Sequence, residues 1–163
     1  MRNRRKAYIV KLLAHRNIDK RLEGMQMLLE LEEKERIPLL LRIIEDKSWR
    51  LRELAAKELS QFGSRVVPRL LKVAKSSLWY ARSASCFALG EIGDVRALET
   101  LVELIKNDDN PTVLKEATLA LGKVLLKNLP FVKDRLEESF WSRFTDLLNG
   151  FDRNLYQEVV KKE

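Results

Sequence analysis

Apolar positions recur along this chain at intervals of 31, 30 and 32 residues. Four segments begin at matching places, and each carries a small residue three positions later, a leucine seven positions later and another apolar residue ten positions later. Offsets of 3, 7 and 10 fall on one face of an α-helix. The pattern therefore predicts four helices that each bury one apolar stripe, starting near Arg21, Arg52, Arg82 and Leu114.

A second helix is predicted after each of these. Pro38, Pro68 and Pro130 stand at matching places in three of the units, and Leu98 stands there in the third unit along the chain. Proline is tolerated at the first position of a helix, where its missing N–H has no intrahelical partner. We therefore expect these residues to open the second helices, and Pro111 to open the last of the first helices.

The predicted fold class is an all-α superhelix (solenoid) that forms one domain over residues 1–163. A hairpin of this length cannot bury its stripe alone, so it packs on its neighbours and the two ends need caps. Asn149-Gly150 is the expected helix stop before the last segment. The expected parts are a basic N-terminal cap helix (1–17), four hairpins (18–45, 46–77, 78–109 and 110–148) and a C-terminal cap helix (151–163).

Two strings in the middle of the chain, WYARSASCFALGEIGDVRALETLVELI and PTVLKEATLALGKV, resemble the short HEAT-like repeats of phycobilisome lyase subunits. The resemblance is strongest over 78–127 and extends to 46–77. It implies an armadillo-type superhelix whose second helices line a concave, partner-binding face. It also implies that Arg52 pairs with Asp46 and ties neighbouring repeats together. Trp49 and Trp79 hold equivalent places, which favours packing between hairpins over base stacking.

The formal net charge of +7 is concentrated in residues 1–21, and the rest of the chain balances to zero. A second local excess spans 61–90, which contains basic residues and no acid. Such charge patterning favours an acidic macromolecular partner, although an ordinary solvated surface also fits. The candidate partner-binding residues are Arg4, Arg5, Arg42, Arg65, Arg69, Lys72, Lys75 and Trp79.

Three functions fit these residues. The first is a protein-binding scaffold or adaptor that docks an acidic surface of another protein in the cytoplasm. The second is a nucleic-acid binder that holds phosphates with the same cations. The third, which the resemblance implies, is an accessory subunit of a modifying enzyme. The sequence leaves the oligomeric state open, and its abundant Lys, Arg and Glu with few Gln suggest a thermophilic source.

No catalytic, cofactor or metal site is predicted. His15 is the single histidine, and Cys86 takes the place that Ala56 holds one repeat earlier, so we expect it in the core. HEAT-like DNA glycosylases combine aromatic residues with an aspartate, but Glu53 and Ser83 stand four residues after the two tryptophans.

The first residues do not predict a secretory signal or a membrane span, since Lys11 interrupts the apolar run that follows the basic start. Tyr8, Ile9, Leu12 and Leu13 form one side of the N-terminal helix. That side could cover the first repeat or lie on an anionic membrane surface, and the cap is the favoured interpretation.

Overall fold

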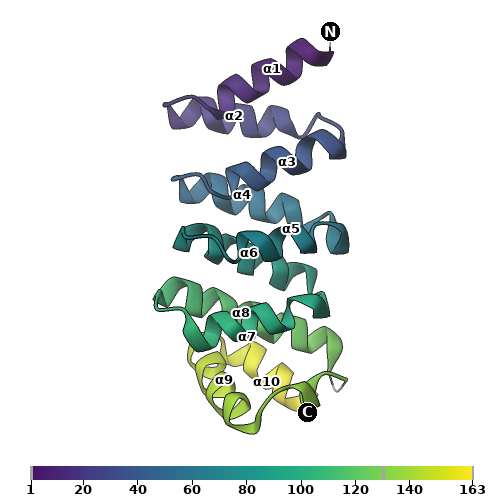
Figure 1. Cartoon of the computed structure of the whole chain (residues 1–163), viewed down its shortest axis with the longest axis vertical. Helices are drawn as coiled ribbons and strands as arrows, with labels where there is room; N and C mark the ends of the chain where they lie inside the picture. Colours follow the sequence, from purple (N-terminus) through teal and green to yellow (C-terminus); the bar gives the residue numbers. More distant parts are fainter. Residues whose placement is uncertain (1, 130, 163) are drawn as a thin grey trace.

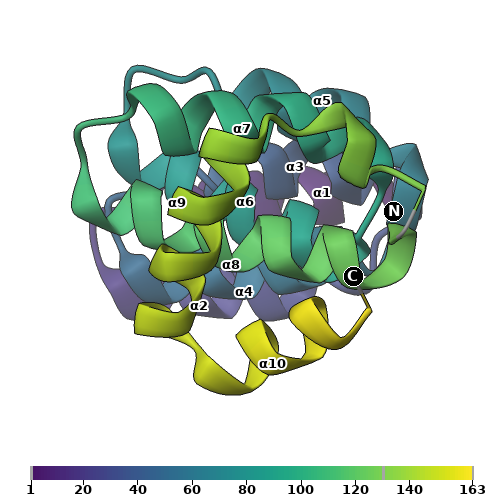
Figure 2. The same cartoon turned by 90° about the horizontal axis from the view of Figure 1, so that it is seen from below.

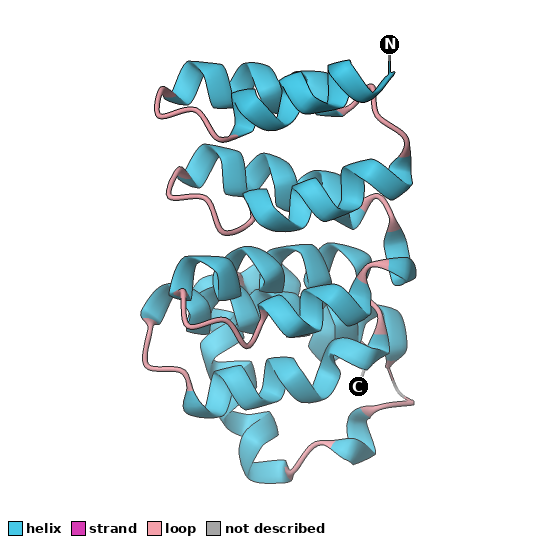
Figure 3. Ribbon diagram, turned by 45° about the horizontal axis from the view of Figure 1, so that its top comes forward, coloured by secondary structure: helices cyan, strands magenta, loops and turns pink. Residues whose placement is uncertain are grey.

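The computed structural model describes residues 2–129 and 131–162. This part of the chain contains ten α-helices and three short 3-10 helices, and no strand. The helices are stacked along the long axis of the molecule, with the N-terminus at one end and the C-terminus near the other (Figure 1). Short loops join successive helices at the two edges of the stack (Figure 3). The predicted all-α superhelix is confirmed.

The stack has two layers of helices (Figure 2). The even layer consists of α2 (Ile18–Leu28), α4 (Trp49–Ser60), α6 (Trp79–Ile92) and α8 (Pro111–Asn128). The odd layer consists of α1 (Arg2–Leu13), α3 (Glu33–Ile43), α5 (Val67–Val73) and α7 (Leu98–Asn107). Three 3-10 helices accompany them: η1 (Gly63–Arg65), η2 (Val95–Ala97) and η3 (Lys133–Arg135). At the C-terminal end, α9 (Glu138–Phe151) crosses the stack and α10 (Arg153–Lys161) packs on α8 and α9.

The even layer carries the stripe that the sequence predicts. The small residues three positions into each unit are all buried, and so are the leucines seven positions in: Gly24, Ala55, Ser85, Ala117, Leu28, Leu59, Leu89 and Leu121. The layer is tightest between α6 and α8, where a Cβ added at Gly90 would lie 2.7 Å from Cα of Ala120. Small side chains at this contact let the two helix backbones approach closely.

The prediction that the prolines and Leu98 open helices is correct at some positions and wrong at others. Pro68 lies in the first turn of α5, and Leu98 and Pro111 begin α7 and α8. Pro38, in contrast, lies inside α3, which already begins at Glu33. Glu33 and Glu35 occupy the first turn of α3, where negative charge suits the helix dipole. Pro38 is exposed, so water can bond the carbonyl that its ring leaves unpaired.

The C-terminal end differs most from the sequence prediction. Pro130 lies outside the described residues, and the helix expected after it is replaced by η3, with α9 beginning only at Glu138. A helix stop is present close to the predicted Asn149-Gly150, but α9 continues to Phe151. Asp152 then caps α10 by accepting the Leu155 N–H at 2.9 Å. This part of the chain departs from the repeat pattern because α9 and α10 cover the end of the stack with buried apolar side chains: Phe140, Trp141, Phe144, Leu148, Leu155 and Val159.

The N-terminal helix α1 packs on α2 and closes the other end. Ile9 is fully buried and Leu12 is 5% exposed, whereas Tyr8 is 48% exposed. No helix among residues 2–129 and 131–162 has both the length and the apolar character that a membrane crossing requires.

If α1 caps the stack, Ile9→Ala should lower the free energy of unfolding by about 2–4 kcal/mol, because it leaves a cavity under the cap. Tyr8→Ala, one residue earlier, should cost less than about 1 kcal/mol because that ring is half exposed. Urea unfolding of both variants measures the difference, and equal losses would contradict the cap.

Candidate partner-binding surfaces

Four cations of the odd layer and its loops have no partner among the residues that the structure describes. Arg42, Arg69, Lys72 and Lys75 are all exposed, and none makes a side-chain hydrogen bond or ion pair with a described residue. A free cation on a surface keeps its full charge available to a partner. These four residues are therefore the basic patch of the odd layer, and this name is kept below.

The remaining predicted cations differ in this respect. Arg65 is bound to Glu33 at 2.8 Å across two hairpins, and Arg5 of α1 is bound to Glu30. Arg4 is exposed and has no such partner among the described residues. The structure thus splits the predicted set into free charges and charges that already serve contacts between repeats.

Shallow grooves separate the helices of the odd layer. The groove between α1 and α3 has a volume of about 320 Å³, and its charged lining residues are Arg42, Glu45 and Asp46. The groove between α7 and η3 has about 280 Å³, and its charged lining residues are Glu99, Glu103, Lys106 and Arg135, of which Glu99 is bound to Arg135 at 2.9 Å. Both grooves therefore combine apolar surface with charges of both signs.

A repeated arginine contact fastens the loops that lead into α2, α4 and α6. The fourth residue of each of these helices is an arginine: Arg21, Arg52 and Arg82. Each points its Nη1 at the loop before its own helix. Nη1 donates to two backbone carbonyls, those of the residues six and five positions earlier, over 2.8–3.2 Å. These bonds satisfy carbonyls that the loop would otherwise leave without a donor.

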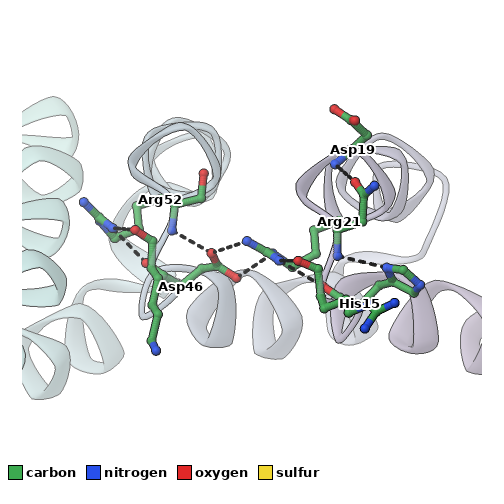
Figure 4. Close-up of polar contacts among 9 residues, drawn as sticks. His15, Asp19, Arg21, Asp46 and Arg52 are labelled. Carbon is green, nitrogen blue, oxygen red and sulfur yellow. Dashed lines mark hydrogen bonds and ion pairs between the residues drawn. The ribbon is translucent and has the colours of Figure 1, made fainter.

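Two of these arginines also bind an aspartate in the loop that leads into the next even-layer helix. Arg82 Nε and Nη2 donate to the two carboxylate oxygens of Asp108 at 2.7 and 3.0 Å. Arg21 faces Asp46 in the same way, with Nε 3.2 Å from Oδ2 and Nη2 donating to Oδ1 over 3.4 Å (Figure 4). We call each such arginine–aspartate pair a rung, because it connects one repeat to the next.

Arg52 has no rung. The expected pairing of its side chain with the Asp46 carboxylate is wrong: Arg52 binds only the backbone carbonyl of Asp46, and the carboxylate faces Arg21 (Figure 4). The sequence prediction missed this because the acid that completes a rung stands 25 or 26 residues after its arginine. Instead, Arg52 stacks on Tyr80 of the next repeat, with Cζ 4.7 Å from the ring centroid.

The electrostatics of the two arginines differ accordingly. Hydrogen bonding to Asp108 raises the pKa of Arg82, whereas burial lowers the pKa of Arg52. Burial would raise the pKa of Asp108, but the hydrogen bonds from Arg82 and from the Asn110 N–H outweigh it, so that this pKa lies below its ordinary value.

The two equivalent tryptophans do not pack between hairpins, contrary to the sequence interpretation. Trp49 is 68% exposed and Trp79 is 42% exposed, at the first residues of α4 and α6. Both line a groove of about 500 Å³ in the even layer, together with Arg52, Tyr80 and Glu116 of α8. The 30-residue spacing of the two tryptophans showed that they hold equivalent places in two repeats. It did not show whether a neighbouring helix covers that side of α4 and α6. Trp79 therefore belongs to the even layer, whereas Arg42, Arg69 and Lys72 of the basic patch belong to the odd layer.

Cys86 lies in the core, as expected, and burial raises the pKa of its thiol. Within the described part of the chain, no three His, Cys, Asp or Glu side chains lie close enough together to hold a metal ion.

The geometry defines an α-solenoid with exposed surfaces on both layers. Models of HEAT repeats match residues 7–77 and 67–148, so the chain belongs to the HEAT-repeat family. A similar solved structure is a chain from "The structure of the complex of CpcE and CpcF of phycocyanin lyase from Nostoc sp. PCC7120". It shares 18% sequence identity, with a TM-score of 0.54, over 94% of this chain and 68% of that one. This likeness shows the fold. The search of curated proteins gave no significant match.

The rung at Arg82 should contribute to stability in a pH-dependent way. Asp108→Asn keeps an acceptor for the Asn110 N–H but removes the charge, so unfolding at pH 7 should become easier by about 1–2 kcal/mol. The pKa of Asp108 is lower in the folded protein than in the unfolded chain. The difference in free energy of unfolding between the wild type and Asp108→Asn should therefore be full above the ordinary aspartate pKa of about 3.9, and it should decline as the pH falls below that value. Urea unfolding of both proteins across pH tests this, and a difference that does not change with pH would contradict it.

Proposed function

We propose that this protein is a non-catalytic scaffold that docks an acidic surface of another protein on its odd layer. The observation that carries the proposal is the basic patch: four exposed cations with no acidic partner among the described residues. Complementary charge at such a surface speeds the encounter and selects the partner. The apolar residues of the groove between α1 and α3, which Arg42 also lines, add contact area.

The modifying-enzyme proposal is a specific form of the same function. A HEAT-repeat chain in the phycocyanin lyase complex has a similar fold. We infer that an accessory subunit of this kind would use the basic patch to hold an enzyme or its protein substrate. The nucleic-acid alternative needs the same cations, so it is tested together with the protein partner.

Reversing the charge at the centre of the basic patch should remove partner binding. Arg69→Glu with Lys72→Glu is expected to weaken the affinity for a protein captured from the source cell by at least about tenfold, since both charges face solvent without an internal partner. Calorimetric titration of the captured partner, once purified, provides the affinity.

The matched control is Arg153→Glu with Lys161→Glu, which makes the same change in charge on exposed residues of α10. It should leave the affinity unchanged. Equal loss in both variants would indicate a general charge effect and contradict the proposed site. Tight binding to single- or double-stranded DNA or RNA that falls steeply with salt, and is lost only in the first variant, would establish the nucleic-acid alternative instead.

A further inference from the structure

Arg52 has two N–H donors, Nε and Nη2, that correspond to the donors with which Arg21 and Arg82 face an aspartate. In Arg21 and Arg82, Nε and Nη2 face a carboxylate in the loop before the next even-layer helix. In Arg52 these two atoms make no hydrogen bond with a described residue, and neither is among the buried polar atoms without a partner. Arg52 therefore presents a fork of donors that remains accessible to solvent.

Arg52 lacks an acidic partner because a serine stands at the position where the other two rungs have an aspartate. Asp46, Ser76 and Asp108 are equivalent, since each side chain accepts the backbone N–H two residues later, at 2.8, 3.2 and 3.0 Å. Ser76 has a short, neutral side chain in place of the carboxylate that would face Arg52. Tyr80 stacks on the guanidinium instead, and this contact leaves the in-plane N–H donors free.

The same arginine lines the groove that contains the exposed tryptophans. Trp49 and Trp79 provide apolar surface in this groove of about 500 Å³, and exposed tryptophan beside arginine is the composition typical of binding hot spots. Two acids also line it. Glu53 is bound to Lys57 at 2.7 Å, and burial raises the pKa of Glu116, which belongs to α8. Arg52 is the one cation among the described residues that line the groove, and it is therefore the residue that suits an anion.

We propose that this groove binds an extended segment of a partner protein, in which an aspartate or glutamate carboxylate completes the rung at Arg52 and an adjacent apolar side chain packs on Trp49 and Trp79. The planar guanidinium fork matches a carboxylate in two parallel hydrogen bonds, as Arg82 and Asp108 show within the protein. This surface is on the even layer and does not depend on the function proposed for the basic patch.

A peptide titration followed by NMR tests the site. The probe is acetyl-Leu-Asp-Leu-amide, and its control is acetyl-Leu-Asn-Leu-amide, which has the same shape without the charge. The aspartate peptide should shift the Arg52 Nε–H and the indole N–H signals of Trp49 and Trp79 saturably, while Trp141, which is 8% exposed, stays as the internal reference. The asparagine peptide should bind at least about tenfold more weakly, because a neutral amide cannot replace the charged acceptor of a fork.

Two variants separate the site from general surface effects. Ser76→Asp supplies the missing acid within the chain and should weaken peptide binding at least about tenfold, whereas Ser77→Asp adds the same charge one residue later and should weaken it far less. Trp79→Ala should also weaken it, whereas Phe131→Ala removes a ring that is 89% exposed elsewhere and should have no effect.

The proposal is overturned if the two peptides bind equally, if Ser76→Asp binds as the wild type does, or if no saturable shift occurs up to tens of millimolar peptide, roughly the weakest range such contacts give. It is also overturned if a single-stranded oligonucleotide shifts the same signals and the aspartate peptide does not, which would assign the groove to nucleobases.

Discussion

The stack depends on the close approach of successive helices in the even layer. Each hairpin is too small to bury its apolar stripe alone, so every repeat is stable only through its neighbours. The contact between α6 and α8 shows how the sequence achieves this, because Gly90 leaves room for the backbone at Ala120. Ser85, also on α6, donates its hydroxyl to the Leu70 carbonyl of α5 at 2.7 Å and so satisfies a polar group inside the core.

This packing sets the register of everything at the surface. Since each even-layer helix starts at the same place relative to its neighbour, the arginines near the helix starts reach loops and acids at a constant offset, and Arg21 and Arg82 form rungs. The same register brings Trp49 and Trp79 onto one groove with Arg52. A single serine at position 76 then distinguishes this groove from the closed contacts on either side. The proposed binding groove and the scaffold therefore use the same repeat, with one rung left open.

Much of the fold could be predicted from sequence, and the failures have physical causes. The apolar period identifies the even layer because buried small residues and leucines recur there at fixed helical offsets. Pro38 misled because a proline on the exposed side of a helix is tolerated well inside it. The C-terminal part departs from the repeat because α9 and α10 cover an apolar surface of α8, where Leu148 and Leu155 lie over Gly122. The four cations of the basic patch were among the candidate residues that the sequence provides, but it did not separate them from Arg5 and Arg65. The ion pairs of Arg5 and Arg65 join residues 25 and 32 positions apart, and the rung that Arg52 lacks would span a similar separation.

The claim that close helix approach holds the repeats together is tested most directly by paired glycine substitutions. Gly90→Ala and Gly150→Ala both remove a glycine from a helix, a change that by itself stabilises by about 1 kcal/mol. A Cβ at Gly150 would meet nothing within 4 Å, whereas a Cβ at Gly90 would collide with the backbone of Ala120. Urea unfolding should therefore show that Gly150→Ala is more stable than the wild type and that Gly90→Ala is less stable by about 1–3 kcal/mol, the usual cost of overpacking. If both variants were stabilised alike, the repeats would not depend on this contact and the account would be wrong.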